Sequence, residues 1–336
     1  MTRIFLTHTP DMLANYYGER ALAALRGLGE VRLNPTGAVL DDPDALAGCA
    51  EGCELVVSDR QTPGPARFFE RAPDLVAFLR CAVDIRNVDV PAAGRQGILV
   101  TRATPGFAAS VAELGVGLMI DLARGVSASV SAYRAGIAPP ARMGRQLRGA
   151  TLGIVGYGII GRTLAPLGLA LGMRVLVSDP NVAIDAPGLK GVSFETLLAE
   201  ADFVALLAVA TPATERLIDA AALARMRPSA CLVNLSRGEL VDEAALEEAL
   251  RSGRIAGAAM DVGRAPDQMP SHRLAARADV VATPHVGGLT PAAIEHQAFD
   301  TVEQVRALIA GEAPPGAVNA DAATRLARLG GGRSAP

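Results

Sequence analysis

The sequence has few cysteines and histidines, and neither residue type is arranged for disulfide formation or metal binding. The four cysteines, Cys49, Cys53, Cys81 and Cys231, form no C-x-x-C pair. The four histidines in the chain are not spaced as metal ligands. We therefore expect free thiols and no metal site.

The chain also lacks a strong net charge and a long apolar run. Its formal net charge of −3 provides no general attraction to nucleic acid or to an anionic membrane. No segment reaches the roughly 18 consecutive apolar residues of a membrane-spanning helix, and the first residues lack the apolar region of a signal peptide. The sequence thus predicts a soluble, cytoplasmic protein that binds neither nucleic acid nor a membrane.

The chain does contain enough apolar residues for two hydrophobic cores. Half of its 336 residues are hydrophobic, and this length is typical of two domains. Strand-like apolar runs alternate with helical patterns, which favours an α/β fold with parallel sheets. A long helix predicted at Thr290–Ala310 could return to the first domain. We therefore predict a discontinuous first domain (residues 1–100 and 290–336) and a second domain (residues 101–289).

Two more helices are predicted from hydrophobic periodicity. Asp11–Leu28 has helical spacing throughout. Ser110–Arg124 is a long apolar helix, in which Ser110 and Glu113 are placed as in a capping box. This second helix is more apolar than one buried face requires.

A glycine-rich turn lies at the centre of the second half of the chain. The apolar run Leu152–Val155 leads into Gly156-Tyr157-Gly158-Ile159-Ile160-Gly161, a G-x-G-x-x-G motif at the start of a predicted helix. In a dinucleotide site, Gly156 would permit the tight turn and Gly158 would let the backbone approach the pyrophosphate. Gly161 would let helix and strand pack closely. The helix start would supply free N–H groups to the phosphate.

Asp179 ends the next apolar run, 18 residues after Gly161. A carboxylate there can bind both ribose hydroxyls and would repel a 2′-phosphate, so NAD is favoured over NADP. An isolated G-x-G-x-x-G motif in a chain with 35 glycines is also compatible with an ordinary tight turn. The order of strand, turn, helix, strand and acid argues against that alternative.

Three predicted strands in the second half end on polar residues that packing does not require, namely Arg237, Asp261 and His285. Ligands of open α/β sheets bind outside the carboxyl ends of the strands, where these residues should gather. An arginine can hold a carboxylate bidentately, and a histidine can transfer a proton. Together they suit a 2-oxo acid. Taken singly, a strand-end arginine is more often a solvated charge, and a lone histidine is more often structural.

The segments VNLSRGELVDEAAL, GAAMDV and TPHVGG, spaced as they are after GYGIIG, resemble the D-isomer-specific 2-hydroxyacid dehydrogenase family. ILVTRATPGFAASVAEL and PPGAVN resemble further segments of that family, so that the resemblance covers roughly residues 55 to 320. It implies two Rossmann-like, doubly wound parallel-sheet domains, with the active site in the cleft between them. It also places the helix Ser110–Arg124 at the two-fold interface of a homodimer.

The resemblance also implies roles for individual residues. Arg237 would bind the carboxylate and carbonyl of the substrate, His285 would be the acid/base, and Asp261 would hold the nicotinamide carboxamide. The expected cofactor is NAD, and the cofactor-binding residues would be Gly156, Gly158, Ile159, Ile160, Gly161, Asp179, Thr211, Leu235 and Asp261.

Two segments depart from the family pattern. The family has a glutamate five residues after the aspartate of its D-V pair, where this chain has Pro266; Asp267 could replace that glutamate as a catalytic partner, or be a solvated loop residue. The family's glycine-rich substrate loop is here Ala82-Val83-Asp84. Asp84 would either pair with Arg80 or Arg86 and turn away, or contact a substrate hydroxyl or amine.

These observations predict an NAD-dependent oxidoreductase that transfers hydride between NAD(H) and C2 of a 2-hydroxy or 2-oxo acid, working mainly as a reductase similar to glyoxylate or hydroxypyruvate reductases. The partner would be a small-molecule acid. Two alternatives stay open from the sequence: an NAD(H)-sensing binding protein similar to the corepressors of this family, and a formate- or phosphite-type dehydrogenase.

Overall fold

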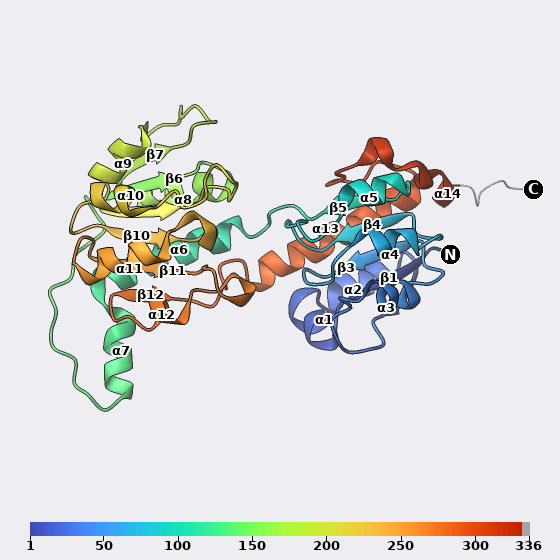
Figure 1. Cartoon of the computed structure of the whole chain (residues 1–336), viewed down its shortest axis with the longest axis horizontal. Helices are drawn as coiled ribbons and strands as arrows, with labels where there is room; N and C mark the ends of the chain where they lie inside the picture. Colours follow the sequence, from blue (N-terminus) through green and yellow to red (C-terminus); the bar gives the residue numbers. More distant parts are fainter. Residues whose placement is uncertain (331–336) are drawn as a thin grey trace, which may run out of the picture. The chain divides into compact units, whose positions relative to one another are not determined.

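A computed structural model describes residues 1–330, with the exception of the Asp267 side chain. The chain divides into two compact units, which we describe separately (Figure 1). Unit 1 consists of Met1–Gly106 together with the chain from Pro291 onward, and unit 2 is Phe107–Thr290.

Unit 1 contains a five-stranded sheet with the order β2-β1-β3-β4-β5. Every pairing in it is parallel, as the alternation of strand and helix patterns predicted. The strands are short and largely buried, so that apolar residues fill both faces of the sheet. They are β1 (Arg3–Leu6), β2 (Glu30–Leu33), β3 (Leu55–Ser58), β4 (Ala77–Arg80) and β5 (Leu99–Arg102).

Helices cover both faces of this sheet, because alternate strand residues point to opposite sides. Leu6, Val57 and Leu79 pack in one cluster with residues of α2 and α13, whereas Phe5 and Phe78 pack in a second cluster with α3, α4 and α5. The helices of unit 1 are α1 (Pro10–Tyr16), α2 (Glu19–Arg26), α3 (Pro43–Cys49), α4 (Ala66–Glu70), α5 (Val90–Arg95), α13 (Pro291–Ala310) and α14 (Ala327–Gly330).

The prediction of one continuous helix over Asp11–Leu28 was wrong. The structure has two helices, α1 and α2, and the chain between them passes through Gly18, which has a φ of 87°. This left-handed conformation is open to glycine and interrupts the helical backbone. Tyr17, at the break, is buried, and its hydroxyl lies 3.0 Å from Oγ1 of Thr301 on α13.

Unit 2 contains a seven-stranded, all-parallel sheet with the order β12-β11-β10-β9-β6-β7-β8. The strand order reverses between β6 and β9, which makes the sheet doubly wound and places a ligand-binding edge at their carboxyl ends. The strands are β6 (Thr151–Val155), β7 (Arg174–Ser178), β8 (Leu189–Gly191), β9 (Phe203–Leu206), β10 (Cys231–Asn234), β11 (Gly257–Met260) and β12 (Val280–Ala282).

Two groups of helices cover the two faces of the larger sheet. The first group, α6 (Ala108–Arg124) and α8 (Ile159–Ala170), shares one cluster with Leu152 and Ile154 of β6. The second group shares another cluster with Val204 and Leu206 of β9. It consists of α9 (Phe194–Glu200), α10 (Ala220–Arg225), α11 (Glu243–Arg251) and the short α12 (His272–Ala275).

Helix α6 begins at Ala108, two residues before the predicted start, so the predicted capping box at Ser110 is wrong. The N-cap residue is Phe107, which makes no side-chain capping bond. The Ser110 hydroxyl instead lies 2.7 Å from the hydroxyl of Thr290, a contact over 180 residues that local spacing does not reveal. Gly125, with a φ of 66°, ends α6, and α7 (Val126–Arg134) follows.

None of the helices formed by residues 1–330 is by itself long and apolar enough to cross a membrane. Helices α6 and α7 together reach the necessary length and composition, but the chain bends by 69° between them.

Candidate active site

The turn after β6 has the shape that a dinucleotide phosphate requires. Gly156 has a φ of 96°, and a Cβ on it would lie 2.6 Å from the backbone nitrogen of Ala208. A Cβ on Gly161 would lie 2.5 Å from the carbonyl oxygen of Gly156, so that only glycine allows α8 to pack this closely. At Gly158, the N-cap of α8, a Cβ would meet nothing within 4 Å. The backbone of Gly158 is therefore unobstructed on the side where a Cβ would stand, which suits close approach of a dinucleotide pyrophosphate to the start of α8.

Asp179 follows β7, and its carboxylate is joined to the glycine turn. One carboxylate oxygen accepts a hydrogen bond from the backbone N–H of Tyr157 (2.7 Å), and the other accepts one from Asn181 (2.9 Å). Each oxygen keeps a lone pair with which it can accept a ribose hydroxyl.

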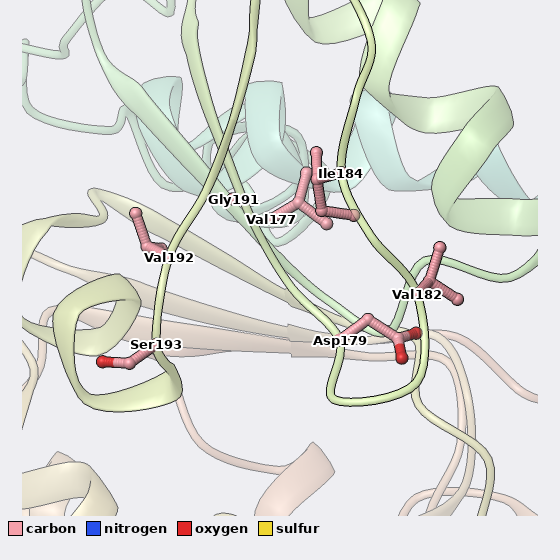
Figure 2. A pocket seen from close by; sticks show the side chains of 7 residues that line it. All are labelled: Val177, Asp179, Val182, Ile184, Gly191, Val192 and Ser193. Atoms are coloured by element: carbon pink, nitrogen blue, oxygen red, sulfur yellow. The ribbon is translucent and has the colours of Figure 1, made fainter.

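Asp179 lines an open pocket of about 370 Å³. Figure 2 shows the side chains that line this pocket. Four aliphatic residues line it together with three others, and the full set is Val177, Asp179, Val182, Ile184, Gly191, Val192 and Ser193. A carboxylate beside aliphatic side chains has the chemistry to bind a nucleoside.

Replacing Asp179 with alanine is expected to weaken NADH binding and to improve NADPH binding relative to it. The alanine variant would lack the carboxylate that is expected to accept both ribose hydroxyls and to repel a 2′-phosphate. Fluorescence titration of wild type and variant with both cofactors measures the ratio of the two dissociation constants. A wild-type protein that binds NADPH as tightly as NADH would contradict the prediction.

The remaining predicted cofactor-binding residues differ in their exposure and in their contacts. Ile159 is half exposed at the start of α8, and Ile160 packs against the adjacent core cluster. Thr211 is exposed, and its backbone N–H donates to the hydroxyl of Thr214 (2.8 Å). The Leu235 side chain is buried in the core against α6, so a cofactor contact at this residue would come from its backbone.

Arg237 stands on a turn whose backbone is held by Asn234 at the end of β10. The Asn234 side chain donates to the carbonyl oxygen of Arg237 (2.9 Å) and accepts from the backbone N–H of Ser236 (3.1 Å). The Ser236 hydroxyl donates to the carbonyl oxygen of Ala208 (2.5 Å), which ties the turn to the end of β9. Arg237 itself is half-buried, and one of its terminal nitrogens donates to the carbonyl oxygen of Ser236 (2.8 Å).

Asp261 follows β11, and its buried carboxylate organises the turn that carries His285. It accepts hydrogen bonds from the hydroxyl of Thr283 (2.6 Å) and from the backbone N–H groups of Val286 and Gly287 (both 2.8 Å). The backbone N–H of His285 donates to the carbonyl oxygen of Asp261 (2.9 Å). Three of the four lone pairs of the carboxylate are thereby used, and one remains for a further donor such as a carboxamide.

His285 has a φ of 54°, in the left-handed region, which is uncommon for residues other than glycine. The bonds to Asp261 stabilise this conformation of the turn. An unusual backbone held in place by its surroundings is frequent at functional sites.

Arg237, Asp261 and His285 lie at the same edge of the larger sheet. The strands that precede them, β10, β11 and β12, are neighbours and run parallel. The turns after β10 and β11 approach closely, since a Cβ on Gly238 would lie 2.2 Å from the backbone of Gly263. The prediction that the carboxyl ends of these three strands lie side by side is confirmed.

Asp267 belongs to a short 3₁₀ turn, Pro266–Gln268, after β11. Its side chain lies outside the described part of the chain, so its predicted pairing with His285 stays a prediction. Within the described residues, no group of three or more His, Cys, Asp or Glu side chains is arranged to hold a metal ion.

In unit 1, the predicted substrate residues Ala82, Val83 and Asp84 belong to the loop that follows β4. The Asp84 carboxylate pairs with the guanidinium of Arg86, with a shortest distance of 2.7 Å, and also accepts from the Arg86 backbone N–H (3.0 Å). Of the two arginines considered from the sequence, Arg86 is thus the partner of this carboxylate. Arg80 instead donates to the backbone carbonyl oxygen of Asp84 (3.3 Å).

A buried polar cluster lies at the carboxyl ends of β1 and β3. The hydroxyls of Thr7 (2.5 Å) and Thr62 (2.6 Å) donate to Asp59. Burial acts to raise the pKa of the Asp59 carboxyl, but these hydrogen bonds outweigh it, and the pKa is lowered overall. His8 is 3% exposed, its ring packs edge-on against Tyr17, and its Nδ1 has no hydrogen-bond partner among the described residues. Burial, with a smaller contribution from the Arg80 charge, lowers the pKa of His8 to about 4.

This pKa predicts that His8 makes the fold less stable in acid. Between pH 6.5 and about 4 the unfolded chain binds a proton at His8 that the folded chain does not, so the free energy of unfolding falls as the pH falls. The loss is on the order of 3 kcal/mol. His8→Phe keeps the ring contact with Tyr17 and should flatten this part of the profile. Urea unfolding of both proteins between pH 7 and pH 4 measures the difference, and parallel profiles would contradict the prediction.

Comparison with known proteins identifies the family. Residues 116–287 match the sequence model for the NAD binding domain of D-isomer specific 2-hydroxyacid dehydrogenases. The chain is also 35% identical over 300 residues to the (S)-sulfolactate dehydrogenase of Chromohalobacter salexigens, covering 88% of this chain and 96% of that protein. The chain belongs to the D-isomer specific 2-hydroxyacid dehydrogenase family. It therefore carries the NAD-binding domain of this family, in which the glycine turn, Asp179 and the three strand-end residues all lie.

Two further similar proteins show how much of the chain the similarity covers. The D-3-phosphoglycerate dehydrogenase of Mycobacterium leprae is 36% identical over 317 residues, which are 92% of this chain but 58% of that protein. The chain thus spans little more than half of that relative. Among solved structures, the TT0316 protein of Thermus thermophilus matches with a TM-score of 0.84 and 33% identity, covering 94% of this chain and all of that chain. The predicted two-domain α/β fold is confirmed by these similarities.

Two residues that shape the candidate site were not identified from the sequence. Thr283 holds the Asp261 carboxylate, and Arg80 contacts the loop of Asp84. Thr283 is part of the family segment TPHVGG, which was a usable signal. The sequence suggested Asp84 as a carboxylate partner of Arg80, but it did not indicate that backbone oxygens bind this arginine.

Proposed function

We propose that this protein is an NAD-dependent 2-hydroxyacid dehydrogenase that works mainly as a 2-oxo acid reductase. The observation that carries the proposal is the convergence of Arg237, Asp261 and His285 at the edge of three adjacent strands in the NAD-binding domain. The names of the relatives support a small 2-hydroxy or 2-oxo acid as substrate: sulfolactate dehydrogenase, phosphoglycerate dehydrogenase and hydroxypyruvate reductase.

In this proposal each residue acts on a different part of the substrate. NADH supplies a hydride for C2 of the 2-oxo acid. Arg237 binds the carboxylate and the carbonyl oxygen through its forked N–H groups. His285 gives a proton to the carbonyl oxygen as it becomes a hydroxyl. Asp261 holds the turn of His285 and keeps one lone pair for the nicotinamide carboxamide.

We also propose that unit 1 is the substrate-binding domain and that Ala82, Val83 and Asp84 contact the substrate. Because the Asp84 carboxylate pairs with Arg86, part of its charge is compensated before an anionic substrate binds. This makes the acidic residue compatible with an acid substrate. We keep the proposal, first made from the sequence, that the carboxylate of Asp267 is the partner of His285.

Turnover of a panel of 2-oxo acids tests this function. Oxidation of NADH is followed by absorbance with glyoxylate, pyruvate, hydroxypyruvate and longer or anionic 2-oxo acids. At least one acid should support steady oxidation that depends on enzyme concentration. Tight NADH binding without turnover of any acid would instead favour an NAD(H)-sensing binding protein.

A homodimer is proposed from the apolar surface of α6, α7 and the segment that follows them. Figure 1 shows α7 extending away from the larger sheet, with a long connection returning to it. Large apolar side chains are exposed along this region, namely Ile120, Val126, Val130, Tyr133, Ile137 and Met143. Several large apolar side chains exposed on consecutive segments of the chain favour a protein interface, and we propose that this interface is two-fold.

Light scattering at micromolar concentration is expected to give twice the mass of the chain. The double substitution Val126→Glu and Val130→Glu places charges on the exposed face of α7 and should shift the protein toward the monomer. A monomeric mass for wild type would rule the dimer out.

A cytoplasmic location and the absence of nucleic acid or membrane partners also remain predictions.

A further inference from the structure

Arg80, at the end of β4, is a buried arginine surrounded by backbone oxygens. Its side chain is 2% exposed. Nε donates to the carbonyl oxygen of Asp84 (3.3 Å), and one terminal nitrogen donates to the Asn87 side-chain oxygen (2.7 Å) and to the carbonyl oxygen of Arg60. The other terminal nitrogen donates to the Ser58 hydroxyl (3.2 Å) and to the carbonyl oxygens of Asp59 and Thr62 (2.7 Å for Thr62).

These acceptors belong to two loops that follow neighbouring strands. Ser58 is the last residue of β3 and Asp59–Thr62 follows it, whereas Asp84–Asn87 is part of the proposed substrate loop after β4. Backbone hydrogen bonds hold the substrate loop near its two ends, from Cys81 to Ser58 (2.9 Å) and from Gly64 to Asn87 (3.0 Å). The backbone N–H of Ala103 also donates to the carbonyl oxygen of Ala82 (3.0 Å). Arg80 connects the carbonyl oxygen of Asp84, in the middle of the substrate loop, to the loop after β3.

The guanidinium has no N–H group left for an anionic ligand. A guanidinium carries five N–H groups, and the three nitrogens of Arg80 already have six acceptors. Its charge is balanced by the nearby Asp59 carboxylate, although burial lowers the pKa of Arg80 to about 10. At neutral pH the side chain therefore stays charged, and its N–H groups donate hydrogen bonds to backbone oxygens of the two loops.

We propose that Arg80 is a positioning residue that fixes the substrate loop Cys81–Asn87 to the loop Ser58–Thr62, and thereby sets the position of Ala82, Val83 and Asp84 toward the substrate. This inference rests on the proposed function of the substrate loop. It assigns Arg80 a role distinct from that of Arg237, which is proposed to bind the substrate itself.

Two variants and one control separate this role from a general contribution to folding. Arg80→Lys keeps the charge but places it on a single nitrogen that cannot reach both loops. Asn87→Ala, at an exposed position, removes one acceptor of Arg80 together with the hydrogen bonds from the Asn87 side chain to the carbonyl oxygens of Arg60 (3.5 Å) and Gln61 (3.3 Å), and it leaves the buried charge of Arg80 in place. Arg325→Lys is the matched control, because Arg325 also donates to two backbone oxygens of unit 1, those of Ala72 and Leu75 (both 2.8 Å), away from the substrate loop.

Hydrogen exchange tests the tether without any need for enzymatic activity. Amides of Cys81–Val88 should exchange faster in Asn87→Ala and in Arg80→Lys than in wild type, since the loop opens more often. Amides of Gly156–Gly161 in unit 2 should be unchanged in all variants. Equal exchange of Cys81–Val88 in wild type and in a folded Asn87→Ala would overturn the proposal, whether or not the protein turns over a 2-oxo acid.

Steady-state kinetics on a 2-oxo acid that wild type reduces tests the consequence for the substrate. In Asn87→Ala, kcat/KM for the acid should fall about tenfold, and in Arg80→Lys about 10²-fold, because small displacements of a positioning group are costly. The dissociation constant of NADH should stay within about twofold of wild type in every variant, and Arg325→Lys should keep its wild-type kcat/KM. A loss of thermal stability with unchanged KM and kcat per NADH-binding site would show a structural role only and would overturn the proposal. Absence of turnover in wild type would refute the proposed function and leave the exchange experiment to decide on the tether.

Discussion

His285→Asn is expected to lower kcat for the reduction of a 2-oxo acid by about 10² to 10⁴, the usual effect of removing a positioned acid/base. Asparagine is the suitable replacement, because it tolerates the left-handed φ of 54° at this residue better than most side chains. The turn should therefore keep its bonds to Asp261, and the lost activity should report the lost proton donor.

The measurement is steady-state kinetics with the best acid of the panel, together with an NADH titration. The dissociation constant of NADH should be little changed, since the glycine turn and Asp179 lie at other strands. Near-normal turnover of His285→Asn would show that another group supplies the proton.

Arg237→Ala is expected to lower kcat/KM by about 10² to 10⁴. Two hydrogen bonds to a charged carboxylate contribute about 1.5–3 kcal/mol each, and 1.4 kcal/mol corresponds to a tenfold change. KM should rise and kcat should fall together, because the contact exists in both ground and transition states. The turn itself should persist, since Asn234 holds the backbone oxygen of Arg237 and not its side chain.

Arg237→Lys is the informative companion, because lysine keeps the charge but cannot bind a carboxylate through a planar fork. It should recover only part of the lost kcat/KM. If Arg237→Ala kept the KM of wild type for every acid tested, a different residue would have to bind the carboxylate.

The sequence predicted those features of the molecule that are encoded locally. The glycine turn is one example, because a positive φ at Gly156 and close packing at Gly161 follow from the motif itself. The strand ends at Arg237, Asp261 and His285 are another, because parallel strands bring their carboxyl ends to one edge.

What the sequence could not predict depends on contacts between distant residues. The bonds from Asp261 to Thr283, Val286 and Gly287 connect residues 22 to 26 positions apart. Within its own segment Ser110 has the pattern of an N-cap residue. In the structure its hydroxyl instead contacts the hydroxyl of Thr290, 180 residues away. Spacing alone likewise does not reveal that Arg80 reaches the backbone of two loops.

The central claim, hydride transfer between the nicotinamide and C2 of a 2-oxo acid at this site, is tested most directly with NADH deuterated at C4. The account predicts a 2-hydroxy acid that carries the deuterium at C2, observed by mass spectrometry and NMR, from wild type but only about 10⁻² to 10⁻⁴ as fast from His285→Asn. Tight binding of NADH with no deuterium transferred to any 2-oxo acid would contradict it.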